Sequence, residues 1–265
     1  MDHTEVGRYW DGNADAWTKL AREGYDVSRD HVNTPGFLEM LPHVDGLTGI
    51  DIGCGEGANT RAVADLGARM TAVDISPTFV RHALSRHADA DIRFLVASAV
   101  DLPFVDESFD FATSFMCLMD LGETAEALAE AYRVLKPGGF LQFSITHPCF
   151  DTPHRRNLRD AEGRTYAIEI GGYFSDSDGE VMEWFFGAAP DEAREGLKPF
   201  KTPIFRRTMS EWINLLIDTG FTIERLGEPT ADEETVERVP SLQDHQVVAY
   251  FLHIRVRKPG EFDTP

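Results

Sequence analysis

The sequence predicts an α/β fold, with a seven-stranded, mostly parallel sheet and helices on both faces. From about residue 47, short apolar runs alternate with helical stretches. A glycine-rich segment directly follows the first apolar run, and the alternation stops after Thr146 before it resumes near residue 208. Alternation of strands and helices is typical of a parallel sheet covered on both faces.

Seven apolar runs are the expected strands: 47–52, 70–75, 92–97, 109–115, 140–146, 221–226 and 247–256. Four segments between them are the expected helices: 57–66, the stretch from Pro77, 123–135 and 209–219. Proline favours a first helical turn, and glycine or a Pro/Gly break favours a helix end. The acidic link 228–246 has no crossover helix pattern, so the last strand is expected to run antiparallel.

The regions outside this alternation suggest three parts. Residues 1–34 carry aromatic residues among polar ones and predict one or two helices before the core. Residues 35–146 and 208–258 form the expected core. Residues 147–207 are rich in Gly, Asp, Pro and aromatic residues, show no long helical period, and form an expected insertion after the fifth strand.

The composition favours a cytoplasmic protein that acts on small molecules. The net charge of −20 repels a nucleic-acid backbone, so a small neutral or cationic ligand, or one shielded in a pocket, is expected. No apolar run reaches the roughly 18 residues that cross a bilayer, and the polar N-terminus does not resemble a signal peptide. The three cysteines are expected to be reduced thiols, no metal site is expected, and a homodimer is left open.

The strongest chemical signal is the segment from Asp51 to Gly57, where the first strand turns into the first helix. Glycines permit tight backbone turns and close approach of a ligand, and the helix N-terminus behind them supplies free N–H groups. Asp74 ends the second strand, 21 residues after Gly53. A carboxylate at that position can accept hydrogen bonds from ribose hydroxyls.

Asp51 distinguishes between two nucleotide cofactors. Gly53, Gly55 and Ala58 also satisfy a relaxed pattern of nicotinamide enzymes. Asp51, two residues before the first glycine, would repel a pyrophosphate but would pair with the ammonium group of a methionine moiety. A purely structural glycine turn is the remaining alternative.

Four motifs in order carry a family resemblance: Asp51–Gly57, Val73–Ser76, Asp101–Asp110 and Leu135–Gly139. They resemble the D-x-G-C-G-x-G, V-D-x-S, D-L-P-F-x-D-x-S-F-D and L-K-P-G-G motifs of class I S-adenosylmethionine-dependent methyltransferases. The likeness is to their small-molecule group, with a type 11/25-like core, and covers about residues 47–146. It implies a Rossmann-like fold, S-adenosylmethionine as cofactor, and methyl transfer to a small-molecule acceptor.

The resemblance also assigns expected cofactor contacts. The methionine end of the cofactor would lie beside the first turn and the residues after the fourth strand: Asp51, Gly53, Cys54, Gly55, Gly57 and Met116, with Cys117 next to them. Asp74 would hold the ribose and Ile75 would pack on the adenine. Ser98 and Ala99 stand where many relatives have an acid followed by Ala. Tyr9, Trp10 and Trp17 are candidates to close over the cofactor, with helix packing as the alternative role.

In-line methyl transfer requires the acceptor to approach above the fourth and fifth strands, which is where the insertion begins. We therefore expect residues 147–207 to cap the acceptor, with Phe150, Tyr173 and Trp184 as contacts, although these aromatics could instead form a small core. O- or N-methylation is favoured. His147 and Asp120 are the candidate general bases. The alternatives are a nicotinamide-dependent reductase and a cofactor-binding regulatory protein without turnover.

Overall fold

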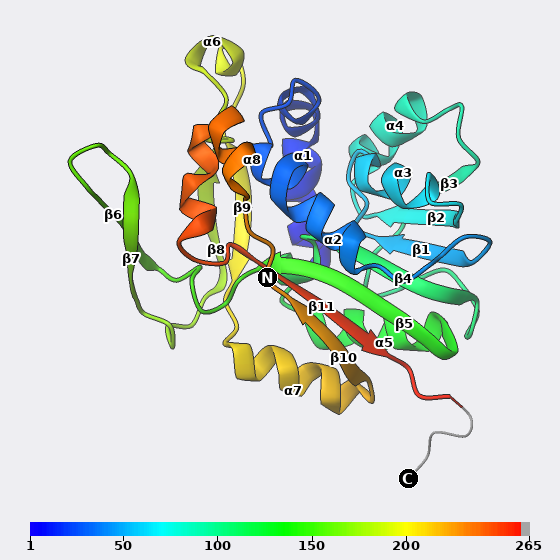
Figure 1. Ribbon diagram of the computed structural model, residues 1–265. Helices are drawn as coiled ribbons and strands as arrows, with labels where there is room; N and C mark the ends of the chain where they lie inside the picture. Colours follow the sequence, from blue (N-terminus) through cyan, green and yellow to red (C-terminus); the bar gives the residue numbers. More distant parts are fainter. Residues whose placement is uncertain (261–265) are drawn as a thin grey trace.

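The computed structural model describes residues 1–260 and contains the expected seven-stranded sheet (Figure 1). Its strands follow the order β10-β11-β5-β4-β1-β2-β3. Their bounds are β1 (Thr48–Ile52), β2 (Arg69–Asp74), β3 (Ile92–Val96), β4 (Phe109–Phe115), β5 (Leu135–Thr146), β10 (Thr222–Gly227) and β11 (Phe251–Arg257). Strand β11 is antiparallel to both of its neighbours, β5 and β10, and the pairs among β1–β5 are parallel. The predicted fold class and the antiparallel last strand are confirmed.

Helices cover both faces of the sheet (Figure 1). They are α1 (His3–Arg22), α2 (Thr34–Met40), α3 (Ala58–Ala64), α4 (Pro77–Arg86), α5 (Thr124–Val134) and α7 (Met209–Thr219). Successive strand residues face opposite sides. On β4, Phe111 therefore joins the cluster that includes Phe37 of α2, whereas Ala112 joins the cluster that includes Leu128 of α5 and Trp212 of α7. Each face thus has its own apolar core.

Helix α7, which precedes β10, shows how local signals set the bounds of an element. The side chain of Thr208 caps α7 by accepting from the backbone N–H of Glu211, and the Glu211 carboxylate accepts from the backbone N–H of Thr208. Gly220 ends the helix in the left-handed conformation, at φ +100°. The predicted bounds of this helix are therefore confirmed.

Some elements differ from the prediction. Strand β5 begins at Leu135, not Phe140, because backbone hydrogen bonds of Gly138 and Gly139 with Lys258 keep the predicted Pro/Gly break within the strand, although Gly138 has φ +77°. The last strand begins at Phe251, not Val247, and the link 228–246, in which no crossover helix was expected, contains the short helix α8 (Glu233–Arg238) and the 3₁₀ helix η3 (Pro240–Gln246). Asp232 caps α8 through the backbone N–H of Thr235, a local signal that lacks the apolar period of a crossover helix.

Residues 147–207 form two hairpins outside the main sheet, with one-turn helix α6 (Asp191–Arg194). The first pairs β6 (His154–Arg159) with β7 (Thr165–Gly171), and the second pairs β8 (Asp178–Trp184) with β9 (Phe200–Phe205). Hydrogen bonds between Thr165 and Gln243 join the first hairpin to η3, and bonds between Asn13 and Lys201 join the second to α1. The two hairpins therefore have separate attachments.

The N-terminal region contains α1 and, after a short turn, the π-helix η1 (Arg29–Asn33), which continues into α2. Helix α1 lies beside α4 (Figure 1), where Asp11 accepts hydrogen bonds from the hydroxyl of Ser76 and the backbone N–H of Thr78. Within residues 1–260, no helix is both long and apolar enough to span a membrane.

Candidate functional site

A cavity of about 750 Å³ lies at the carboxyl ends of β1, β2 and β4. Its walls come from the turn after β1, helix α1, the segment before η1, and both hairpins of the insertion. Ligands in open α/β sheets bind at this edge. The cavity therefore joins the glycine-rich turn to the aromatic insertion in one space.

Asp51 ends in the floor of this cavity and is 1% exposed. Its two carboxylate oxygens accept hydrogen bonds from the hydroxyls of Thr60 and Thr113. Burial raises the pKa of Asp51 to about 6, while these hydrogen bonds oppose the shift and the charge of Asp74 adds to it. A cationic ligand group would favour the ionised form of this carboxyl.

The glycines of the turn have different roles. A Cβ on Gly53 would lie 2.2 Å from Sγ of Cys117, and the φ of Gly53 is +75°. The lack of a side chain at Gly53 therefore lets the turn after β1 pack against the turn after β4. Gly55 has φ +54° and open space where a Cβ would be, so its backbone borders the cavity. Gly57 begins α3, is not part of the cavity wall, and would place a Cβ against His87 and Phe94.

Asp74 lies across the turn from Asp51 and is held by the backbone. One of its oxygens accepts from the N–H of Gly55 and the other from the N–H of Ser76, both at 2.8 Å. Burial raises the pKa of Asp74 to about 6, against the effect of these two bonds. Each oxygen retains a second lone pair, so the carboxylate can still accept from a diol.

Four more residues expected at the cofactor line the cavity: Cys54, Ile75, Ser98 and Ala99. The thiol side of Cys54 packs in a buried cluster with Ala72 and Val80. The hydroxyl oxygen of Ser98 accepts from the backbone N–H of Val100 at 3.3 Å, so its proton remains available to an acceptor.

Met116 and Cys117 also line the cavity, immediately after β4. Met116 has φ +54°, an uncommon conformation for a residue with a side chain. Its backbone N–H donates to the carbonyl of Ser144 on β5, which fixes the turn. Strained backbone of this kind is often found where a chain borders a functional site.

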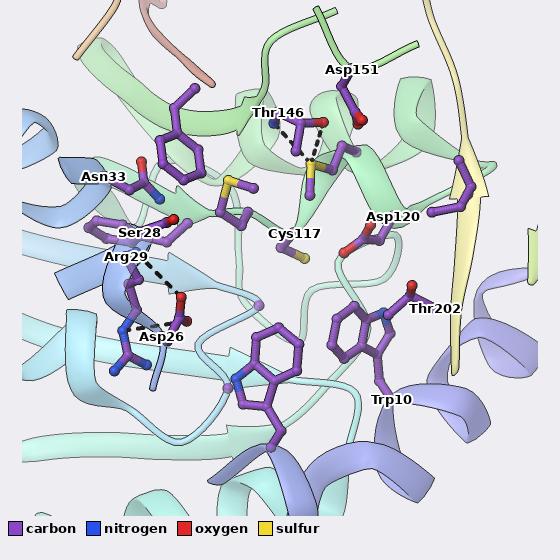
Figure 2. Close-up of a pocket in the computed structure, with 18 of the residues that line it drawn as sticks. Trp10, Asp26, Ser28, Arg29, Asn33, Cys117, Asp120, Thr146, Asp151 and Thr202 are labelled. Atoms are coloured by element: carbon purple, nitrogen blue, oxygen red, sulfur yellow. Dashed lines mark hydrogen bonds and ion pairs between the residues drawn. The ribbon is translucent and has the colours of Figure 1, made fainter. Parts of the chain in front are cut away.

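The sequence did not indicate the polar cluster made by Asp26, Arg29 and Glu56. All three line the cavity. The Arg29 guanidinium lies 3.8 Å from an oxygen of Asp26 (Figure 2) and 3.8 Å from an oxygen of Glu56. Burial raises the pKa of Asp26 to about 6, against the effect of the Arg29 charge. No motif spans these positions, because the turn after α1 brings Asp26 and Arg29 to Glu56 only in the folded chain.

Two tryptophans of α1, seven residues apart, face the cavity. Trp10 and Trp17 are in edge contact at 5.4 Å, and both line the cavity. Trp17 also packs against Trp184, Phe186 and Phe200 of the insertion. The structure does not bring Tyr9 to the cavity, because the helical period places Trp10 and Trp17 on that face instead.

Asp120 lies in the short 3₁₀ helix η2 (Leu118–Asp120) and points into the cavity (Figure 2). Its carboxyl has no hydrogen-bond partner among the described residues. Burial, with a smaller contribution from the charge of Asp151, raises the pKa of Asp120 well above its usual value. A carboxyl of this kind is a strong proton acceptor when it is ionised.

His147 differs from this, because the structure turns its ring away from the cavity wall. The ring is 2% exposed and both nitrogens have partners. Nδ1 accepts from the backbone N–H of Cys149 at 3.2 Å, so Nε2 carries the proton and donates to Glu228 at 2.9 Å. In this arrangement the neutral imidazole has no free lone pair for a substrate.

The three residues expected at the acceptor all line the cavity: Phe150, Tyr173 and Trp184. Phe150 packs on the ring of His147 at 4.7 Å. The hydroxyl of Tyr173 accepts from the backbone N–H of Met209, and Trp184 donates to the hydroxyl of Thr202. These three side chains therefore both pack against the protein and line the cavity.

The sheet order, the glycine turn and the two buried aspartates at its carboxyl edge define a Rossmann-like enzyme that binds a nucleoside cofactor. The model of a family described as "Methyltransferase domain" matches residues 50–143. A probable S-adenosylmethionine-dependent methyltransferase of Mycolicibacterium smegmatis is 32% identical over 67% of this chain and 70% of its own length. The chain belongs to the S-adenosylmethionine-dependent methyltransferases, whose cofactor is S-adenosylmethionine.

Two further comparisons agree with this. An S-adenosylmethionine-dependent methyltransferase structure from Mesorhizobium loti has a TM-score of 0.68 and 27% identity, over 84% of this chain and 96% of that one. The demethylmenaquinone methyltransferase of Tropheryma whipplei is 39% identical over 42% of this chain, a match that spans less than half of that relative, 46%. The matched family domain, residues 50–143, includes the motifs Asp51–Gly57 and Val73–Ser76.

Proposed function

We propose that this enzyme methylates a small-molecule acceptor, on oxygen or nitrogen, in the cavity described above. The observation that carries the proposal is the continuity of that cavity, which runs from the Asp51–Gly55 turn to the aromatic residues of the insertion. Its volume of about 750 Å³ is within the range of small-molecule sites. A cofactor at one end and an acceptor at the other would share one space shielded from water.

The chain's own residues fit the cofactor at the edge of the sheet. Asp51 would neutralise the methionine ammonium, and Arg29 would attract the methionine carboxylate. Asp74 would accept bonds from the ribose, Ile75 would pack on the adenine and Ser98 would accept from or donate to its polar edge. The cofactor supplies an activated methyl group, so the protein supplies orientation, exclusion of water and control of protons.

Residues 147–207 would form the cap over the acceptor. Phe150, Tyr173 and Trp184 come from three different parts of that segment and line the cavity together. Flat or apolar groups pack well against such side chains. Residues 1–34 would close the opposite side, with Trp10 and Trp17 as the contacts on α1.

Asp120 is the candidate general base in this proposal. It lines the cavity just beyond Met116 and Cys117, has no hydrogen-bond partner among the described residues, and has a raised pKa. An ionised Asp120 would accept a proton from an acceptor hydroxyl or amine as the methyl bond forms. His147 would instead hold the end of β5 through Glu228 and Cys149.

The test is label transfer from methyl-labelled S-adenosylmethionine into small molecules of a bacterial metabolite extract. We expect labelled products below the size of peptides, together with release of S-adenosylhomocysteine. The variant Asp74→Ala, folded as judged by circular dichroism, is the control that should lose both. Exchange of label into protein alone would contradict a small-molecule acceptor.

A binding comparison addresses the two alternatives. S-adenosylhomocysteine should raise the thermal unfolding midpoint, and NADH should not. A shift with NADH alone would favour a reductase. Binding of S-adenosylmethionine without label transfer to any extract would favour a regulatory protein.

A further inference from the structure

Strand β6 contains a run of basic residues: Arg155, Arg156 and Arg159. Arg156 pairs with Glu169 at 2.8 Å, and Arg159 pairs with Asp244 at 3.4 Å. Arg155, which directly precedes Arg156, has no ion pair or hydrogen bond from its side chain among the described residues. Arg155 therefore carries a positive charge without a paired carboxylate in a protein whose net charge is −20.

The surroundings of Arg155 show where its guanidinium is directed. Arg155 lines the cavity, and the alternation of β6 turns Arg156 to the opposite side, toward Glu169. The guanidinium carbon lies 4.2 Å from the ring centre of Tyr250, another residue of the cavity wall. Its Nη2 atom is buried and has no hydrogen-bond partner in the structure.

Beside this group is a second polar atom without a partner. The ring of His245 stacks on Tyr250 at 4.0 Å. Its Nδ1 is buried and has no hydrogen-bond partner within residues 1–260, although Nε2 lies 3.0 Å from the hydroxyl of Ser28. Burial, which outweighs the nearby charge of Asp244, lowers the pKa of His245 to about 4. The ring is therefore neutral at physiological pH, and Arg155 is the source of positive charge at this end of the cavity.

The wall of the same cavity contains another arginine with the same property. Arg206 follows β9, lines the cavity, and has no ion pair or hydrogen bond from its side chain within residues 1–260. Its Nε is buried without a partner. Its neighbour Arg207, in contrast, donates to the carbonyls of Leu121 and Gly122 and so has a structural role.

A guanidinium nitrogen that is buried without a partner is unfavourable, because it loses hydration and gains no hydrogen bond in return. Arginine presents a planar fork of donors that matches a carboxylate or a phosphate, and it retains that fork while it stacks on an aromatic ring. We propose that the acceptor carries a carboxylate or phosphate group, bound by Arg155 beside Tyr250 and His245. This inference rests on the proposed function, and of the acceptors expected from net charge it selects one that is shielded in a pocket over a neutral or cationic one.

The remainder of such an acceptor would pack against the aromatic side chains of the insertion. The cavity wall also includes Phe150, and the β8–β9 hairpin with the residue after β8 contributes Trp184 and Phe185. The proposal therefore specifies an acid with an apolar or aromatic body. Arg206 would add a second contact for an acceptor with two anionic groups.

Direct binding tests the proposal without knowledge of the natural acceptor. The probes are phenylacetate, phenyl phosphate, benzyl alcohol and benzylamine, titrated by calorimetry into protein saturated with S-adenosylhomocysteine. At least one anionic probe should bind about tenfold or more tightly than the neutral and cationic probes, since charge-assisted bonds to arginine are strong. The preferred anion distinguishes a carboxylate site from a phosphate site.

Two variants of the same strand complete the design. Arg155→Gln should lose about tenfold or more of the anion affinity. Arg156→Gln removes the same charge outside the cavity and should leave that affinity within about twofold, since an exposed pair contributes little. Both should bind S-adenosylhomocysteine like the parent, which also reports that they are folded.

Equal binding of the four probes, or unchanged anion affinity in Arg155→Gln, would overturn the proposal. Failure to bind S-adenosylhomocysteine would instead count against the proposed function, and the two results are separate readouts. An independent check uses the labelled extract described above. The labelled product should be retained on an anion exchanger at neutral pH, and label only in the unretained fraction would also overturn the proposal.

Discussion

The imidazole of His147 donates from Nε2 to Oε1 of Glu228 at 2.9 Å, and this bond connects the end of β5 to the segment after β10. The other ring nitrogen accepts from the backbone of Cys149. A histidine at the end of a central strand is a common catalytic choice, yet here both nitrogens are used to fix the chain. The geometry therefore favours Asp120 over His147 as the general base.

His147→Ala tests that assignment. Loss of a buried hydrogen-bonded group should lower the free energy of unfolding by about 1–3 kcal/mol. Turnover with a saturating acceptor should remain within a few-fold of the parent value across the neutral pH range. The measurements are urea unfolding and initial rates of S-adenosylhomocysteine release. A large rate loss that shrinks toward low pH, where a histidine base is protonated and inactive, would restore His147 as the base.

Asp120→Asn should lower turnover by about 10²–10⁴-fold while the affinity for S-adenosylhomocysteine stays unchanged. The charge of Asp151 raises the pKa of Asp120, so Asp151→Asn should lower that pKa. Because the base acts when ionised, the acidic limb of the kcat/KM profile should then move to lower pH. A shift to higher pH, or full activity in Asp120→Asn, would contradict the assignment.

Asp51 makes the stability of the unliganded enzyme depend on pH. Its folded-state pKa of about 6 exceeds the ordinary value of 3.8, so the folded state binds the proton more tightly. The associated stability is present at low pH and is lost as the pH rises through about 6. The free energy of unfolding of the parent, minus that of Asp51→Asn, should fall by on the order of 2–3 kcal/mol between about pH 4 and 7. Urea unfolding across that range measures it, and a constant difference would rule the effect out.

Gly53→Ala should destabilise the fold by about 1–3 kcal/mol, because a Cβ would overlap the Cys117 side chain and the backbone is left-handed. Thermal unfolding with and without S-adenosylhomocysteine measures both the stability and the response to the cofactor. Gly12→Ala is the matched control: Gly12 lies within α1 and has open space where a Cβ would be, so this change should be neutral or stabilising. Equal effects of the two substitutions would mean that the contact with Cys117 has no energetic role.

The sequence was sufficient for those parts of the fold that are set locally. Helix α7 is bounded by a capping pair and a terminal glycine, all within a dozen residues, so its limits were predictable. The same holds for Asp51 and Asp74, because strand ends of a parallel sheet meet at one edge. Local patterns and the topology of the sheet reinforce each other in this region.

The rest of the site depends on contacts between distant segments. Arg29 reaches Glu56 only after α1 and its turn pack against the sheet. The lack of an ion pair at Arg155 is visible only in the folded chain, where Arg156 and Arg159 pair with carboxylates. The choice of Trp10 over Tyr9 depends on the exact rotation of α1, which an aromatic-rich sequence does not specify. The hairpins of the insertion lack a continuous apolar face, so they left no regular pattern to recognise.

The separate attachment of the two hairpins has a consequence for how this enzyme can change. The β6–β7 hairpin is joined to η3 through Gln243, whereas the β8–β9 hairpin is joined to α1 through Asn13. Either hairpin can therefore be shortened, lengthened or exchanged while the anchor of the other one stays intact. Neither anchor involves Asp51, Asp74 or the glycine turn. If the insertion binds the acceptor, as proposed, substitution of one hairpin should change the acceptor preference and leave the chemistry of the sheet edge unchanged.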